Sequence, residues 1–313
     1  MLDSVASKAI AREESVLVID PKGERDCRDS LKRRCEAVGQ PERFTMLDPS
    51  DPADSIRISP LSHYTRATEL AIRIAGLSAS AQVEDDPLTC FATLVLTSII
   101  NGMLLVGETP TLVAVNRAMT HHGAQALLER ALVTWCRRYV ANWPARAGAY
   151  IGNAAPGKAT VDALVRFYRE QAGEQARCPE LDHLLSVFEH DPEHMRKMTA
   201  PLMSVLASLT DADIGPLLSP DPHDGGEIGD LARLIDNAGV FYIRIDTPSE
   251  PTTGAAIAAL MLADLTALVR QRRDASLPDT PINVLVDPAT VNPAMMRSLD
   301  KARGAGIRVR FDA

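Results

Sequence analysis

Two short apolar runs near opposite ends of the chain each end on an acidic residue. They are Ser15 to Asp20, with the sequence SVLVID, and Ile282 to Asp287, with the sequence INVLVD. Unbroken apolar runs of this length are typical of strands buried in a parallel sheet. Ligands of open parallel sheets bind beyond the carboxyl ends of the strands. We therefore expect the carboxylates of Asp20 and Asp287 to lie at a ligand-binding edge.

The first run is followed by a turn with the sequence DPKG, from Asp20 to Gly23. A proline and a glycine at these positions favour a tight turn. Asp20 and Lys22 would then project into the crevice, where Lys22 could meet a phosphate or DNA. The alternative is an ordinary strand-to-helix turn with an exposed lysine. With the second acid-tipped run, the pattern suggests the sheet of a nucleotide-hydrolysing motor.

The composition is that of a globular protein with a large core, because 46% of the residues are hydrophobic and 24% are charged. The formal net charge of -8 argues against a surface built throughout for non-specific binding of nucleic acid. Any DNA contact must be local, as at the clusters LKRR (31–34) and RQRR (270–273). Because such basic runs are common, we favour the alternative that these clusters are solvated helix faces.

The five cysteines are odd in number and contain no CxxC pair, so neither a disulfide framework nor a zinc ribbon is indicated. The N-terminal segment has no basic region followed by an apolar one, as a signal peptide would. We expect a reducing, cytoplasmic setting. The most apolar stretch, Cys90 to Gly107, contains several polar residues and predicts a buried helix rather than a membrane span.

The chain divides into three blocks by its periodicity. Residues 1–60 predict a strand–helix–strand unit, and residues 226–313 again alternate strands with helices. Residues 61–225 show only helical periodicity, interrupted by Gly, Pro or Asp. The expected fold is α/β: the outer blocks complete one open sheet around an inserted all-α domain. The expected strands are 15–20, 44–47, 240–246, 282–287 and 307–311, and the expected helices of the middle block are 66–77, 88–106, 110–120, 124–142, 160–172, 180–188 and 192–209.

Two motifs imitate catalytic sites. The sequence GNAAPGKAT (152–160) satisfies GxxxxGK, but alanine replaces the required Ser or Thr, and the preceding segment is a poor buried strand. The sequence HDPEH (190–194) formally fits a zinc-protease pattern. Its Asp191 and Pro192 predict a helix start between the histidines, which we expect to point apart. No metal site and no catalytic constellation is predicted.

Four ordered strings resemble one protein family. They are VLVIDPKGERD near the start, APLMSVLASLTDADIGPLLSPD (200–221), GVFYIRIDTPSEPTTGAAIAALMLADL (239–265) and LDKARGAGIRV (299–309). In this order they resemble the ATPase domain of TraD-type conjugative coupling proteins, motors related to FtsK that bring DNA to a type IV secretion channel. The resemblance covers nearly the whole chain.

The resemblance implies a RecA-like, P-loop NTPase-type domain (1–60 and 226–313) around an inserted all-α domain (61–225). It also implies ATP and Mg²⁺ as cofactors, with DNA and relaxosome or secretion-channel proteins as partners. Family members are anchored in the inner membrane through an N-terminal region that these 313 residues lack. Asp287 matches the Mg²⁺-binding Asp of the Walker B motif, with Asp20, Lys22 and Gly23 as further candidates of the nucleotide crevice.

The chain departs from the family pattern at catalytic positions. The family's phosphate loop would lie immediately upstream of Met1, and Pro288 stands where a catalytic Glu is expected. Proline cannot act as a base, so we expect this polypeptide not to hydrolyse ATP, and we expect a monomer or weak oligomer. Lys301 and Arg303 are candidates for a subunit interface or pore, or basic residues that complement a helix dipole. The alternative function is a non-enzymatic interaction or regulatory module that keeps the motor fold.

Overall fold

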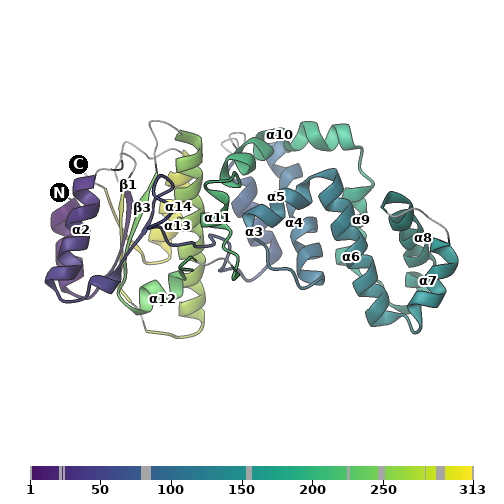
Figure 1. The fold of residues 1–313 in the computed structure, drawn as a ribbon, viewed down its shortest axis with the longest axis horizontal. Coiled ribbons are helices and arrows are strands. Elements are labelled where there is room, and N and C mark those ends of the chain that lie inside the picture. The colour runs from purple at the N-terminus through teal and green to yellow at the C-terminus, as the bar shows by residue number, and fades with distance from the viewer. Residues whose placement is uncertain are drawn as a thin grey trace.

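The computed structural model describes residues 2–20, 23, 25–78, 86–152, 157–223, 226–245, 251–278, 280–286 and 293–311. The molecule is elongated, with a lobe built on a β-sheet at one end and a lobe of helices at the other (Figure 1). Both chain termini lie at the outer end of the sheet lobe (Figure 1).

The sheet is parallel and has five strands in the order β2-β3-β1-β4-β5. Its centre lies in the core, because all residues of β1 and β4 are buried. This burial explains why both strands appear in the sequence as unbroken apolar runs. The strands are β1 (Ser15–Asp20), β2 (Phe44–Leu47), β3 (Val240–Arg244), β4 (Ile282–Val286) and β5 (Arg308–Phe311).

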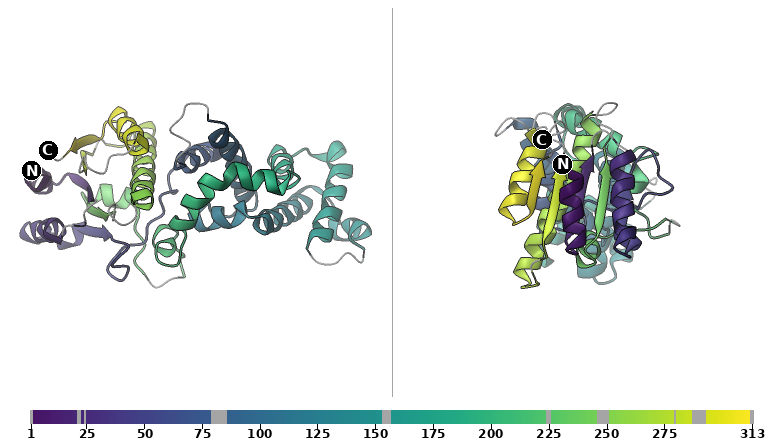
Figure 2. Two further views of the ribbon diagram at one scale, coloured as in Figure 1. Left: turned by 90° about the horizontal axis from the view of Figure 1, so that it is seen from above. Right: turned by 90° about the vertical axis from the view of Figure 1, so that its left-hand side faces the viewer.

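Helices cover both faces of the sheet. Helices α1 (Leu2–Ala11) and α2 (Arg25–Ala37) pack on one face, against a cluster that includes Val18 and Tyr242 (Figure 2, right). Helices α13 (Pro251–Asp274) and α14 (Pro293–Gly304) bury the other face. Alternate side chains along each strand point to opposite faces of the sheet, so they pack in the two different clusters.

Among the described residues of the second lobe, helices are joined by loops and turns, and no strand is present. Most of its helices begin and end within a few residues of the sequence-based expectation, but α7 and the short α11 were not predicted. The elements are α3 (Ala67–Ala75), α4 (Pro87–Leu105), α5 (Leu112–Met119), α6 (His121–Tyr139), α7 (Trp143–Ile151), α8 (Lys158–Gln175), α9 (Pro179–Phe188), α10 (Pro192–Leu209) and α11 (Gly215–Leu218), with α12 (Leu231–Asp236) leading back into the sheet.

The two lobes meet where α3 packs against α13, the helix between the sheet and the helical lobe (Figure 1). A buried ionic network joins them there. The Arg73 guanidinium donates to Asp264 through Nη1 at 2.7 Å, and the backbone N–H of His63 donates to the same oxygen at 2.9 Å. His63 Nδ1 lies 2.7 Å from the other Asp264 oxygen. Arg73 also donates to the carbonyl oxygens of Pro60 and His63, so the network fixes the chain segment that links the lobes.

A second polar contact joins the strands at the amino end of the sheet. Asn283 on β4 donates to Glu14 at 2.8 Å, and Arg308 on β5 donates to the other Glu14 oxygen at 3.1 Å. Burial acts to raise the pKa of the Glu14 carboxyl, but the hydrogen bonds from Asn283 and Arg308 outweigh it and lower that pKa below its ordinary value. Glu14 is therefore held ionised between two neighbouring strands.

Two helices are long and apolar enough to cross a membrane by length and composition, α4 and the segment Thr252–Asp274 of α13. The described α4 packs against α3, α6, α9 and α10, and 78% of the apolar window in α13 is buried inside the fold. Core helices of globular proteins meet the same criterion. All five cysteines are free thiols, in agreement with the sequence-based expectation.

The histidine prediction was wrong, although the predicted helix start is present. Asp191 caps α10 by accepting from the His194 backbone N–H at 2.7 Å. The His190 and His194 rings do not point apart: their centroids lie 5.1 Å from each other, and both rings contact Phe91. Both imidazole rings pack against the apolar Phe91 ring, which places them side by side. Among the described residues, no group of three or more His, Cys, Asp or Glu could hold a metal ion.

Candidate functional site

A small polar cavity of about 250 Å³ lies at the carboxyl ends of β1, β3 and β2. This is the edge at which open parallel sheets bind ligands. Asp20, the predicted crevice carboxylate, pairs in register with Arg244 at the end of β3. The cavity is lined by Gly23, Arg25, Arg28, Asp48, Ser50, Asp51, Tyr242 and Arg244.

Asp20 is buried and held by two donors. The Tyr242 hydroxyl donates to Asp20 Oδ2 at 2.7 Å, and the Gly23 backbone N–H donates to Oδ1 at 3.0 Å. Burial, with the hydrogen bond to Asp20, raises the pKa of Tyr242 well above its ordinary value, so its hydroxyl stays protonated as a donor. Asp20 therefore links the Tyr242 hydroxyl on β3 to the backbone of Gly23.

Gly23 is required by the backbone and by its neighbour. Its φ of +64° is a conformation that residues with a side chain rarely adopt. A Cβ added at Gly23 would lie 2.2 Å from Arg244 Nε, well inside contact distance. The absence of a side chain at Gly23 thus lets the guanidinium of Arg244 lie against its backbone.

Arg244, at the end of β3, is one of three arginines in the described lining of this site. Its Nη1 lies 3.4 Å from Asp48 Oδ2 and donates to the Ser50 hydroxyl. Its Nε is buried and has no hydrogen-bond partner among the residues that the structure describes. A buried guanidinium donor without a partner is costly, and an anion in the cavity would satisfy it. The arrangement is suited to binding a phosphate or carboxylate.

Two further cations border the cavity at the start of α2. Arg28 donates to its neighbour Asp29 at 3.0 Å, and this hydrogen bond raises its pKa further. Arg25 is the first residue of the helix. The described lining of the crevice, with three arginines, therefore suits an anionic group.

The sequence-predicted residues fall in three places. Gly23 lines the crevice and Asp20 lies beside it, bonded to Tyr242, whereas Lys22 and Asp287 lie outside the described residues. The strand that precedes Asp287 ends at Val286, which pairs with Ile19 beside the crevice. Sequence analysis missed Arg244, Asp48 and Ser50, although their positions at or just after the ends of β3 and β2 are the same signal that identified Asp20.

Lys301 and Arg303 lie on α14, away from the crevice lining. Arg303 is 3.9 Å from Asp300, and its guanidinium lies over the Phe311 ring at 5.2 Å from the ring centre. Lys301 lines a groove between the two lobes. Their predicted role at a subunit interface or pore stays a prediction.

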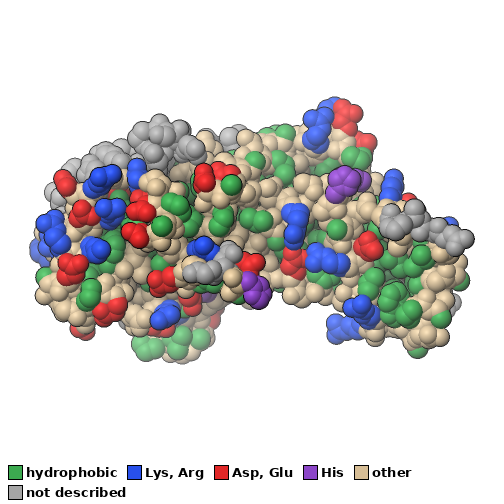
Figure 3. Space-filling model, viewed as in Figure 1, with side chains coloured by type: hydrophobic (Ala, Val, Ile, Leu, Met, Phe, Trp, Pro, Cys, Tyr) green, Lys and Arg blue, Asp and Glu red, His purple; other side chains and the backbone are tan. Residues whose placement is uncertain are grey.

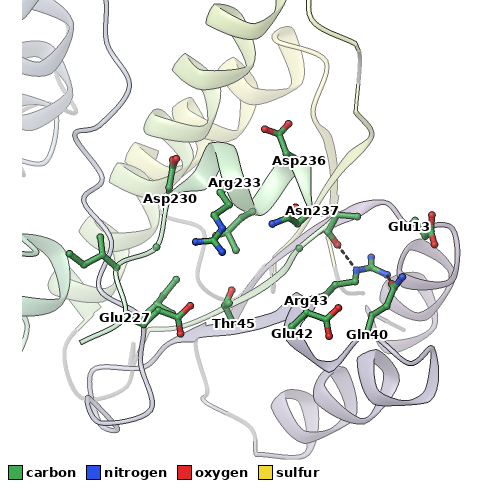
Figure 4. A pocket seen from close by; sticks show the side chains of 16 residues that line it. Glu13, Gln40, Glu42, Arg43, Thr45, Glu227, Asp230, Arg233, Asp236 and Asn237 are labelled. Carbon is green, nitrogen blue, oxygen red and sulfur yellow. Dashed lines mark hydrogen bonds between the residues drawn. The ribbon is translucent and has the colours of Figure 1, made fainter. Parts of the chain in front are cut away.

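A larger cavity of about 660 Å³ lies at the opposite edge of the sheet, near the starts of β2 and β3 (Figure 4). Arg43 on its wall is buried and donates to the carbonyl oxygens of Ala238 at 2.8 Å and Ile10 at 3.0 Å. These bonds join three chain segments, so Arg43 has a structural role. Because ligands of parallel sheets bind at the carboxyl edge, we assign the candidate site to the smaller crevice.

The GxxxxGK string lies between two helices of the second lobe. Gly157 and Lys158 lie at the start of α8, and the segment before residue 152 is the helix α7 rather than a strand. A phosphate loop needs a preceding buried strand to aim the helix terminus at the phosphates.

The described surface of the sheet lobe carries acidic and basic side chains interspersed, and no uniformly positive or negative face is seen in this view (Figure 3).

No family model matches the chain, and no curated protein matches it either. Solved structures similar to this chain include three of the conjugative coupling protein TrwB. An unbound form has 15% sequence identity and a TM-score of 0.48, over 98% of this chain and 57% of that chain. The complex with ADP and Mg²⁺ has 14% identity and a TM-score of 0.49, over 99% and 58%.

The TrwB complex with the non-hydrolysable GTP analogue GDPNP has 16% identity and a TM-score of 0.50, over 99% of this chain and 59% of that chain. The present chain thus spans less than three fifths of the solved TrwB chains. At this identity the likeness bears on the fold alone. The chain has the α/β fold of the conjugative coupling protein TrwB, which confirms the resemblance predicted from the four sequence strings.

Proposed function

We propose that this chain is a coupling-protein-like motor domain of conjugative DNA transfer that does not hydrolyse ATP as these 313 residues. The observation that carries the proposal is the TrwB fold along 99% of the chain, with the acid-tipped strand β1 at the centre of the sheet. The crevice beside Asp20 supports it, since its arginines suit an anionic ligand at the edge where motors bind nucleotide. We propose a cytoplasmic location and DNA and secretion-system proteins as partners.

The sequence supports the inactivity. Catalysis of phosphoryl transfer depends on positioning groups around the phosphates and on a residue that orients the attacking water. Pro288 follows Asp287 and cannot take the second role. The one GxxxxGK string, GNAAPGKAT, lacks the Ser or Thr that would contact magnesium and follows a helix. The crevice arginines can hold a phosphate but offer no substitute for these groups.

Calorimetric titration with Mg-ATP tests this proposal. We expect no tight binding and no heat of turnover, whereas micromolar affinity with continuing hydrolysis would contradict it. The matched variant is Arg244→Gln, which removes the unpartnered buried donor of the crevice. Weak anion binding at the crevice should be lost in this variant and kept in Arg137→Gln, an exposed arginine on α6 far from the sheet.

A non-enzymatic interaction module is the second candidate function, and one observation favours it. The helical lobe holds a mainly apolar cavity of about 500 Å³ between α4, α9 and α10, lined by residues that include Ile99, Phe188 and Met203. Flexible methionine and aromatic side chains are common at protein-binding surfaces. A pull-down with secretion-system components, compared with single-stranded DNA binding across salt, separates the two functions, because a phosphate contact weakens steeply with salt and an apolar interface does not.

A further inference from the structure

A groove of about 550 Å³ runs between the two lobes, with α3 and α4 on one wall and α13 and α14 on the other. It is separate from the crevice at the sheet edge, with which it shares no lining residue. Both lobes are needed to form it, because its lining residues come from helices of each.

The groove is strongly cationic. Arg66, Arg270, Arg297 and Lys301 line it and are exposed, and Glu69 is the one acidic residue among its described lining residues. Glu69 lies 3.9 Å from Arg66 and also accepts the Thr65 backbone N–H. A fifth cation, Arg73, is already committed to Asp264 in the buried network below. The described lining of the groove therefore carries more positive than negative charge.

Three of these cations have no partner in the part of the chain that the structure describes. Arg270, Arg297 and Lys301 make no hydrogen bond or ion pair there, in contrast to Arg272, which pairs with Asp236 at 2.7 Å on the same helix as Arg270. Arg297 and Lys301 are four residues apart on α14, so they project from the same helix face. Like charges gathered in this way repel each other, and a bound anion would relieve the repulsion.

The remaining lining determines which anion fits. Ala259, Ala263 and Ala267 recur every four residues along α13, so they share one helix face, and they leave room for a ligand between the cations. The hydroxyls of Thr93 and Thr266 donate to carbonyl oxygens of their own helices, at 2.7 and 2.6 Å. The described lining includes no aromatic side chain, so the stacking platform that binds the bases of single-stranded nucleic acid is missing.

We propose that this groove binds a compact polyphosphate, such as the phosphate chain of a free nucleotide or an inorganic polyphosphate. The guanidinium groups of Arg270 and Arg297 match phosphate oxygens in geometry, and Lys301 adds a point charge. Because Arg66 belongs to the helical lobe and the other cations to the sheet lobe, the bound anion bridges the two lobes. This site is independent of the proposed motor function and of the crevice.

Titration of the 313-residue protein with sodium tripolyphosphate at low ionic strength tests the proposal. We expect saturable binding that weakens as salt screens the charges. The triple variant Arg270→Gln, Arg297→Gln and Lys301→Gln should weaken binding about tenfold or more, since three charge-assisted contacts are lost. The matched control removes three exposed arginines of the helical lobe, Arg137, Arg138 and Arg166, each changed to Gln, and should bind within about twofold of the unchanged protein.

A second arm identifies the source of the phosphates. A nucleoside triphosphate should compete with tripolyphosphate, and a single-stranded oligonucleotide of equal phosphate concentration should bind more weakly to the groove. No saturable binding, an equal loss in the control variant, or tighter groove-dependent binding of the oligonucleotide would each overturn the proposal. Circular dichroism of the triple variant checks that the fold is unchanged, as expected for exposed side chains.

Discussion

The substitution Asp264→Asn should strongly destabilise the protein, because it removes the negative charge from the network that joins the lobes. The Asp264 side chain is 0% exposed, and those of its partners Arg73 and His63 are 6% and 13% exposed. Asparagine keeps the size of the side chain but leaves the buried Arg73 charge without a counter-charge. Removing one partner of a buried ion pair costs about 3–5 kcal/mol. We expect a loss of this size in the free energy of unfolding.

Urea denaturation followed by circular dichroism measures this loss. The matched control is Asp274→Asn at the exposed end of the same helix, which should change the stability by no more than about 0.5 kcal/mol. A second variant, Asp264→Leu with Arg73→Met, removes both charges and should regain most of the lost stability. A loss below about 1 kcal/mol in Asp264→Asn would refute the reasoning, since it would mean that Arg73 is not buried against this carboxylate.

Three further predictions concern the crevice, the sheet and the thiols. Gly23→Ala should lower the free energy of unfolding by about 1 kcal/mol or more and displace Arg244. Gly39→Ala is also at positive φ but has open space around it, so it should show the backbone cost alone. Urea denaturation measures the free energy of unfolding of both variants. Glu14→Gln should destabilise at neutral pH, and the difference from the unchanged protein should shrink as the pH falls below 4.5, because the lowered pKa of Glu14 stabilises the fold only while the carboxyl is ionised. In thiol labelling, the exposed Cys90 should react first. Burial raises the pKa of Cys136 to about 11, so this thiol should not react until the protein unfolds. Fast labelling of Cys136 in the folded protein would contradict its buried position.

The sequence alone predicted the sheet and its edge because buried strands leave an unmistakable composition. The runs that became β1 and β4 are apolar throughout, and their positions at either end of the chain already implied an inserted block. Helix α7 escaped prediction because Pro144 and the alternating small residues of its sequence resemble a loop, although proline is favoured in the first turn of a helix. Helix α7 packs against α8, and such a contact between helices cannot be recognised from the local sequence.

The candidate site was predicted only in part, for a related reason. Asp20 stands out because it ends an apolar run, but Arg244 becomes recognisable only when the strand order places β3 beside β1. Strand order depends on contacts between residues more than two hundred positions apart, which a single sequence does not reveal. The ring contact of His190 with His194 was missed likewise, since it depends on Phe91, which belongs to a different helix.

The most direct test of the central claim is the rate of phosphate release from Mg-ATP by the purified 313-residue protein, with and without single-stranded DNA. The account predicts release at the background rate of buffer in both cases, and no change in the variant Asp287→Ala. Turnover above background that DNA stimulates and that Asp287→Ala abolishes would show an active motor, and would contradict the claim that these residues form a coupling-protein fold without hydrolysis.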